Sequence, residues 1–213
     1  FYDFSAKLLF DLSEKTSFRA NFLTIKNDLE FTETLLSSSN SETSNLKQSS
    51  TVGGLSWQQI WTPKLKTNLL SYGSYYQLNS VSEQIFTTQK LTQENEVLEL
   101  GLKLDGVVSL SEKTELQAGY HFSETGIANT QDVNLPRFRN FEKDVLRTHI
   151  AFANITLTTL ADKTNLNIGF RANYFTKFNK VLIEPRFTLH HKLGNGFAAE
   201  ILGEFKSQST TQR

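Results

Sequence analysis

Hydrophobic and polar residues alternate along most of this chain with a period of two. In the first segment the apolar residues occupy every second position from Tyr2 to Leu12, and the positions between them are mostly polar. Because successive side chains of a β-strand point to opposite faces, this pattern predicts a strand with one apolar and one polar face. The alternation returns at 98–105, 115–122, 165–174 and 181–190, and noisier segments rich in aromatic and β-branched residues lie at 17–31, 51–61, 68–79, 145–159 and 197–206. We therefore expect about ten strands.

The connections between these segments are of two kinds. Short connections begin at residues 13, 62, 111 and 161, about 49 residues apart, and three of them share the form small–acidic–Lys–Thr. A further short one is Gly194-Asn195-Gly196. These are compositions typical of tight turns. Longer polar connections alternate with them, at 32–50, 80–94 and 123–144, although the connection at 176–179 is short. This alternation places the tight turns at one end of the sheet, as in outer-membrane barrels.

Strand length and turn asymmetry together favour a transmembrane structure. Many predicted strands run ten residues or more, whereas strands of soluble sheets average about 5 or 6 and tilted membrane-spanning strands need about 9–11. We expect an all-β fold in which residues 1–213 form a segment of an antiparallel transmembrane β-barrel facing outer-membrane lipid. A soluble sandwich also alternates and is the main competing fold. Aromatic residues near strand ends are candidates for interfacial girdles: Phe18, Trp57, Trp61, Tyr174 and Phe175.

Composition excludes several other classes of protein. Lys and Arg number 22 and Asp and Glu number 22, so no net charge attracts nucleic acid, and no nucleic-acid partner is expected. The chain has no Cys, which excludes disulfides and thiolate chemistry. It contains no run of 18 apolar residues that would predict a membrane-spanning helix. It begins at Phe1 and ends at Arg213 within a polar run, from which we expect a piece of a longer protein.

The C-terminal third resembles a known family. The segment 181–189, which contains Glu184-Pro185-Arg186, resembles the "EPR" strand of TonB-dependent outer-membrane receptors. The preceding strand contains Gly169, Arg171 and Tyr174 and resembles the "GxRxxY" strand of the same family. The strand that ends at Phe205-Lys206-Ser207-Gln208 is similar to the family's strand that closes on Gln. This specific resemblance covers about 145–208, and the style of the hairpins suggests a Bacteroidota-type receptor.

The resemblance implies a larger assembly than this chain. Receptors of the family have a barrel of 22 strands, a plug domain inside it and an N-terminal box that binds a TonB-type energising protein. They import scarce nutrients such as siderophores, haem, vitamins, glycans or peptides. Plug, box and about half of the strands are absent from this sequence, so import is expected of the whole protein. The alternatives are a structural barrel subunit of a larger outer-membrane assembly, and a small closed barrel acting as a pore or an enzyme.

Two groups of residues are candidates for functional contacts. The alternation places Arg171, Glu184 and Arg186 on the polar side, facing the lumen, where Glu184 and Arg186 pair with each other or contact the plug. A substrate path lined by the lumen charges is one interpretation, but a solvated wall, or paired charges that hold the plug, is the simpler one. In the connection 123–144, the cluster around Arg137, Phe138 and Arg139 is a candidate contact for a ligand or a surface lipoprotein, or else an ordinary surface loop.

No catalytic, cofactor or metal site is predicted. His190 and His191 are adjacent on a strand and so point to opposite faces, where they cannot share an ion. His121 falls on the polar side of its strand. The serines include no Gly-x-Ser-x-Gly nucleophile elbow, and the glycines form no phosphate-binding or dinucleotide pattern. We therefore expect a protein that is not an enzyme.

Overall fold

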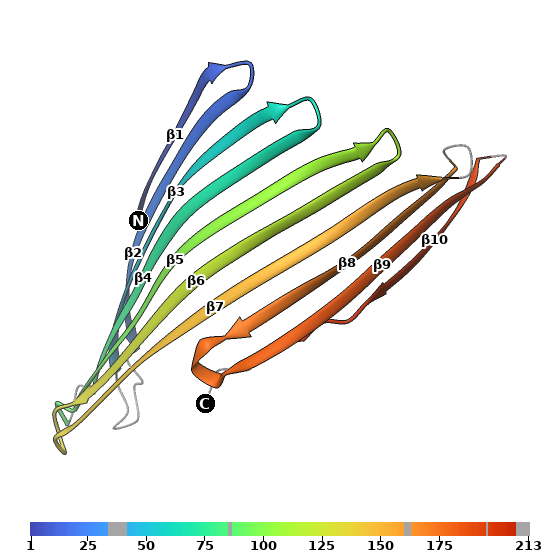
Figure 1. Ribbon diagram of the computed structural model, residues 1–213. Helices are drawn as coiled ribbons and strands as arrows, with labels where there is room; N and C mark the ends of the chain where they lie inside the picture. The colour runs from blue at the N-terminus through green and yellow to red at the C-terminus, as the bar shows by residue number, and fades with distance from the viewer. Residues whose placement is uncertain (34–41, 85–86, 160–162, 195, 208–213) are drawn as a thin grey trace.

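The chain forms one antiparallel sheet of ten strands in sequence order (Figure 1). This computed structural model describes residues 1–33, 42–84, 87–159, 163–194 and 196–207. Within that part of the chain no helix is long and apolar enough to cross a membrane. The elements are β1 (Tyr2–Ser13), β2 (Thr16–Glu33), β3 (Glu42–Thr62), β4 (Leu65–Gln84), β5 (Lys90–Ser111), β6 (Thr114–Val133), β7 (Phe138–Thr159), β8 (Thr164–Phe175), the 3-10 turn η1 (Thr176–Phe178), β9 (Lys180–Gly194) and β10 (Phe197–Glu204).

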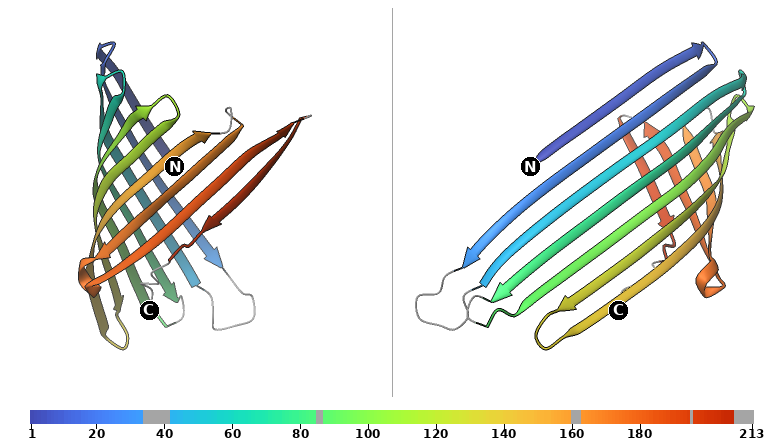
Figure 2. Two further views of the ribbon diagram at one scale, coloured as in Figure 1. Left: turned by 45° about the vertical axis from the view of Figure 1, so that its right-hand side comes forward. Right: turned by 90° about the vertical axis from the view of Figure 1, so that its left-hand side faces the viewer.

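The sheet is bent into a trough and has two open edges (Figure 2). Each strand pairs with the strands before and after it in sequence, so β1 and β10 lie at opposite edges. Among the described residues no pairing joins β1 to β10, as a closed ten-stranded barrel requires. All ten strands belong to one sheet, so the described residues provide no second sheet for a sandwich. The prediction of an all-β antiparallel sheet of about ten strands is confirmed.

The two faces of the trough differ in polarity and in exposure. One face carries apolar residues that are open to the surroundings, such as Leu8 at 71%, Leu55 at 65% and Ile183 at 62% exposure. Side chains on the other face partly bury one another, as expected on the inside of a bend. Ile150, Asn154 and Asn173 on that face are buried. We call these the convex face and the concave face. Ile150 is the single buried hydrophobic residue among those described. The sheet thus has no apolar core of its own.

Cross-strand register keeps the apolar residues on the convex face through every strand. Phe18 of β2 pairs with Trp57 of β3, which pairs with Leu69 of β4. The row continues to Leu104 and Tyr120 on the next two strands. Because side chains directly opposite each other lie on the same face, one such row fixes the facing of all neighbouring positions. The same registers place Arg171, Glu184 and Arg186 on the concave face.

The tight turns have a common construction. The strands end at Ser13, Thr62 and Ser111 and resume three residues later. In each turn the hydroxyl of that last residue accepts a hydrogen bond from a backbone N–H two residues on, at 3.2 Å. This replaces a missing ladder bond and explains the small hydroxyl residue at this position. A register shift precedes each turn by one or two residues. The predicted turn at 161–164 lies partly outside the described residues. Asn195 and Gln208 also lie outside them.

The predicted long connections are mostly strand. β3 begins at Glu42, β4 reaches Gln84, β5 begins at Lys90, and β6 and β7 extend to Val133 and from Phe138. The strands β2 to β7 therefore reach 18–22 residues. Residues 34–41 and 85–86 of the expected long loops lie outside the described residues. Over the rest of 32–50, 80–94 and 123–144 the expectation was mostly wrong, because both faces carry polar residues there and the sequence lacks alternation. Pairing with neighbouring strands, rather than apolar burial, holds these extensions.

Candidate functional site

The concave face carries the polar residues that a lumen would present, and Tyr72 lies near their centre. The hydroxyl of Tyr72 on β4 donates to Glu99 Oε1 on β5 at 2.9 Å. His121 Nε2 on β6 lies 2.9 Å from the same oxygen. Since a phenol has a single proton, His121 donates its Nε2–H to Tyr72. The Lys103 ammonium lies 5.8 Å from the centre of the Tyr72 ring. Three strands thus contribute to one polar cluster.

Gly101 makes room for this cluster. It lies opposite Tyr72 in the register of β4 and β5. A Cβ at Gly101 would lie 2.2 Å from Tyr72 Cζ, so only glycine allows the ring to cross this strand. The ring therefore covers the glycine backbone and reaches His121 two strands away. An aromatic residue over a strand glycine is a recognised way to pin register.

The family-motif residues lie together near the C-terminal edge, and Glu184 and Arg186 do not pair with each other. Arg186 donates from Nε and Nη2 to Asn154 Oδ1 at 3.0 and 2.8 Å. Glu184 Oε1 accepts from the backbone N and the hydroxyl of Ser207 at 3.1 and 2.5 Å. Arg171 donates to Asn173 Oδ1 at 2.9 Å. Glu184 and Arg186 thus have separate partners. Arg186 reaches Asn154 on β7 across Gly169 of β8, which lies between them in the register.

These three residues border an open polar pocket of about 380 Å³. Its lining also includes Glu204 and Lys206 at the end of β10. Phe175 lines the same pocket. It therefore lies on the concave face, and its expected place in a convex aromatic girdle was wrong. Basic and acidic groups face the cavity together, which suits docking of a polar protein surface better than binding of one small ion.

Aromatic residues of the convex face form two groups near opposite ends of its apolar band. Phe18 and Trp57 stack with ring centres 6.3 Å apart, and Trp57 meets Trp61 edge-on at 6.3 Å. Near the other end His149 contacts Tyr120, Phe122 and Tyr174 with ring centres 5.1–6.2 Å apart. Tyr120 and His149 also share a 2.6 Å hydrogen bond. Rings with a polar tip at both ends of an apolar band are typical of interfacial girdles.

The four histidines lie in separate surroundings. His121 is in the Tyr72 cluster, His149 is in the convex aromatic group, and His191 Nδ1 lies 2.7 Å from the Thr164 hydroxyl. His190 lies on the face opposite His191, as the alternation predicts. In the described part of the chain no three His, Asp or Glu residues come close enough to hold a metal ion.

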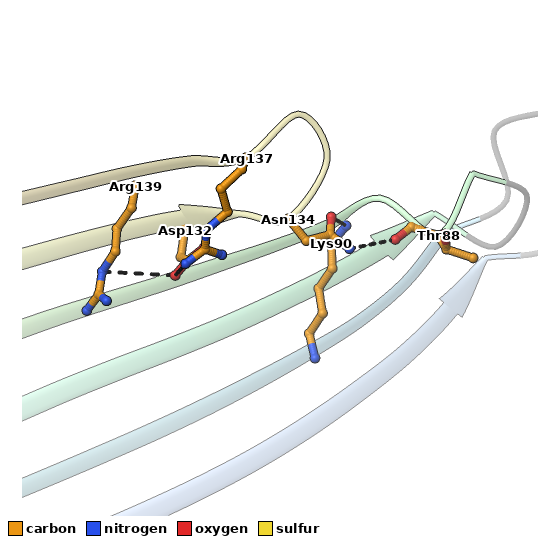
Figure 3. A network of polar contacts seen from close by, with 6 residues as sticks. All are labelled: Thr88, Lys90, Asp132, Asn134, Arg137 and Arg139. Atoms are coloured by element: carbon orange, nitrogen blue, oxygen red, sulfur yellow. Dashed lines mark hydrogen bonds and ion pairs between the residues drawn. The ribbon is translucent and has the colours of Figure 1, made fainter.

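Arg137 and Arg139, which flank Phe138 in the sequence, lie where two hairpin tips join (Figure 3). Asn134 Oδ1 accepts from the Lys90 backbone N at 2.6 Å, and Asn134 Nδ2 donates to the Thr88 carbonyl at 2.9 Å. Arg137 makes a two-pronged contact with Asp132 at 2.6 and 3.2 Å. Arg139 lies 4.0 Å from the same carboxylate. Phe138 is 53% exposed and begins β7 with Arg139, so only Arg137 of the three belongs to the turn.

A second contact holds the turn at η1. The Lys177 ammonium forms an ion pair with Asp144 on β7. The Asp144 carboxylate also accepts from the Val145 backbone N at 2.8 Å. Together the hydrogen bond from Lys177 and the one from Val145 lower the pKa of Asp144 from its ordinary value. Asp144 is therefore charged at neutral pH and anchors η1 to the extended part of β7.

We predict that Tyr72→Phe and Gly101→Ala disrupt the same cluster. Removing the hydroxyl loses the bonds to Glu99 and His121, and a Cβ at Gly101 displaces the ring, so each change should cost about 1–2 kcal/mol of unfolding free energy. The double variant should cost little more than either single one. Gly106→Ala on the same strand is the control, because its Cβ would be at least 3.5 Å from other atoms. Fully additive costs in urea unfolding would contradict this coupling.

A second prediction concerns the joined tips. Asn134→Ala removes the side-chain bonds to Lys90 and Thr88 and should loosen both hairpins together. Hydrogen–deuterium exchange should then accelerate at 87–90 as well as at 134–137. Asn140→Ala is the control, since the Asn140 side chain makes one long bond to Glu142 at 3.4 Å. Faster exchange confined to 134–137 would show that the tips are independent.

The chain is similar in structure to solved proteins, whereas the comparisons of its sequence found no match. No protein-family model matches the sequence, and no curated protein matches it. A structure described as the RagAB peptide transporter is 8% identical with a TM-score of 0.70, over 91% of this chain and 30% of that one. FpvA of P. aeruginosa, bound to heterologous pyoverdines, is 15% identical with a TM-score of 0.65, over 93% of this chain and 34% of FpvA.

A third structure agrees with these two. FyuA, the ferric yersiniabactin uptake receptor from Yersinia pestis, is 10% identical with a TM-score of 0.54, over 95% of this chain and 41% of FyuA. The chain thus spans less than half the length of each of the three proteins. At such low identity the likeness concerns the fold. The resemblance drawn from the sequence is confirmed at that level: the chain has the fold of the strand wall of TonB-dependent outer-membrane receptors.

Proposed function

We propose that this chain is part of the barrel wall of a TonB-dependent receptor that imports a scarce nutrient across a bacterial outer membrane. The observation that carries the proposal is the inverted polarity of the sheet. Large apolar side chains are exposed on the convex face, while polar and charged ones shade one another on the concave face. In water this arrangement would leave a very large apolar patch uncovered. Against hydrocarbon on one side and an aqueous or protein-filled lumen on the other, it is stable.

The height of the apolar band supports a membrane location. On β5 the exposed convex residues run from Leu98 to Leu110. Twelve residue steps of about 3.3 Å, tilted by about 45°, rise roughly 28 Å. Outer-membrane barrels have an apolar band about 25 Å tall. The two aromatic groups near the ends of the band fit girdles at the two interfaces.

The open edges indicate that further strands complete the barrel. The outer edges of β1 and β10 have no strand partner among the described residues. Hydrocarbon cannot hydrogen-bond these backbone groups, so a membrane-spanning sheet must close. We propose that residues 1–213 form a partial barrel segment and that the remaining strands of a 22-stranded wall pair with both edges. The low coverage of the similar structures fits this proposal.

The concave face suits a plug domain. Arg171, Glu184 and Arg186 face the proposed lumen around a polar pocket, where a plug could dock through hydrogen bonds and ion pairs. A TonB-type protein would then act on that plug from the periplasm, and no catalytic residue of this chain takes part. At the opposite end, the exposed Phe138 beside Arg137 and Arg139 offers a contact for a surface lipoprotein.

A matched pair of substitutions tests the direction of the two faces. Leu69 and Leu70 are neighbours on β4 that pair with Leu104 and Lys103, on the convex and concave face respectively. In the full-length protein reconstituted into vesicles, Leu69→Arg should lower the unfolding free energy by about 2–4 kcal/mol, as arginine does on a lipid-facing surface. Leu70→Arg should cost less than about 1 kcal/mol, because it enters a wet lumen. Equal costs would contradict the membrane orientation.

Cell fractionation and transport measurements test the function as a whole. The full-length protein should occur in the outer-membrane fraction and migrate differently on a gel before and after boiling. Disrupting its gene should abolish uptake of one nutrient, and disrupting the TonB-type protein should abolish the same uptake. Unchanged mobility or a soluble location would overturn the barrel proposal. Uptake that persists without the TonB-type protein would overturn active import and leave a pore or a structural barrel.

A further inference from the structure

The outer ends of the strands project beyond the apolar band. On the convex face the apolar residues give way to charged ones near Lys26 on β2 and Glu96 on β5. Beyond these positions the convex face continues as polar strand on β2 to β6. Its charged residues there include Lys26, Asp28, Lys47, Glu94, Glu96 and Asp132. Since charged side chains avoid hydrocarbon, this part of the wall stands in water outside the membrane.

Over most of the length of these segments, within the described side chains, the concave face carries no charge. Among the described side chains, the concave positions of 23–29, 44–52, 74–82, 91–97 and 125–133 are all neutral. We call this surface the neutral wall. Charged residues reappear on this face below it, at Glu99 and Lys103, and beside it on β7, at Glu142 and Asp144. The two faces of the same strands therefore differ in charge although both stand in water.

Amide side chains gather on the neutral wall without partners. Asn27 lies opposite Gln48, Asn95 opposite Asn129, and Gln93 opposite Gln131. Within the described residues none of these six side chains makes a hydrogen bond, and all are partly or fully exposed. Each amide has two N–H donors and a carbonyl acceptor. A surface with so many unused donors and acceptors can bind a ligand that itself carries both kinds of group.

A mostly apolar row runs beside the amides. Tyr76, Val97 and Ile127 lie in register on β4, β5 and β6. On the other side of Tyr76 the row passes through the polar Ser50 on β3 and ends at Ile25 on β2. Ile127 is 37% exposed, so the row is open to the lumen. Three of its five members carry aliphatic side chains. Apolar groups and amides thus lie next to each other at the spacing of adjacent positions on paired strands.

We propose that the neutral wall binds an uncharged, extended peptide with apolar side chains. A peptide backbone presents an N–H and a C=O at every residue, which match the free amides. The row of Tyr76, Val97 and Ile127 would cover its apolar side chains, which an oligosaccharide does not have. A charged ligand would lose hydration here and find no opposite charge. The proposal rests on the proposed import function and specifies the class of nutrient.

Selection from peptide pools tests this proposal. The full-length protein in detergent would be equilibrated with two pools of N-acetylated, C-amidated octapeptides, and the retained peptides identified by mass spectrometry. One pool contains Ala, Leu, Val, Ser, Asn and Gln, and in the other Asp and Lys replace Asn and Gln. We expect the neutral pool to be retained about tenfold more strongly, which corresponds to about 1.4 kcal/mol. Equal retention, no retention, or displacement of the peptides by maltoheptaose would overturn the proposal.

Substitutions that add charge to the neutral wall provide a second, independent test. Asn95→Asp combined with Asn129→Asp should weaken retention of neutral peptides about tenfold and increase retention of Lys-containing ones. The matched control is Asn79→Asp, which lies on the convex face of β4 between Lys47 and Glu94 and should leave selection unchanged. An equal effect of the control would count against the neutral wall. Heat-modifiable mobility confirms that each variant is folded, and a wild-type protein that passes this check but retains no neutral peptide would refute the ligand class alone.

Discussion

Backbone hydrogen bonding between neighbouring strands is the constraint on which the rest of this structure depends. Within the described residues Ile150 is the only buried hydrophobic side chain, so no packed core holds the strands together. Instead each strand forms a ladder of hydrogen bonds with the strands next to it in sequence. A barrel wall in hydrocarbon requires this, because an unpaired backbone group there costs several kcal/mol. Once the backbone groups are paired, the side chains of each face can match the polarity of the surroundings of that face.

That freedom decides which parts of the fold the sequence reveals. Where the convex positions are uniformly apolar, as from Leu98 to Leu104, strict alternation appears and predicts both the strand and its facing. Where polar residues occupy both faces, as in 42–50 and 90–94, alternation disappears although the strand continues. Polarity alone therefore favours loops there. The turns at 13–16, 62–65 and 111–114 were predictable because their hydroxyl residues are needed locally, to accept a backbone N–H.

The candidate site divides in the same way. The alternation of side chains along β9 was enough to place Glu184 and Arg186 on the polar face, which is the concave one. Their partners were not predictable, because Asn154 and Ser207 reach them only through the registers of three neighbouring strands. The Tyr72 cluster depends on register to an even greater degree. A ring that covers Gly101 and meets His121 joins residues 49 positions apart, and no local pattern in the sequence indicates such a contact.

The distribution of charge shows that the two faces diverge even where both meet water. Outside the apolar band, hydrophobic burial cannot explain why charged residues occupy the convex face of β2 to β6 and avoid the concave face. Solubility alone would be served equally well by charges on either side. Charge on the convex side suits contact with bulk water and lipid headgroups, which solvate ions well. On the concave face, charge is absent beside amides such as Asn95 and Asn129, which make no hydrogen bond within the described residues. This fits a surface that binds a neutral ligand, since a charged side chain there would keep its hydration water and oppose binding.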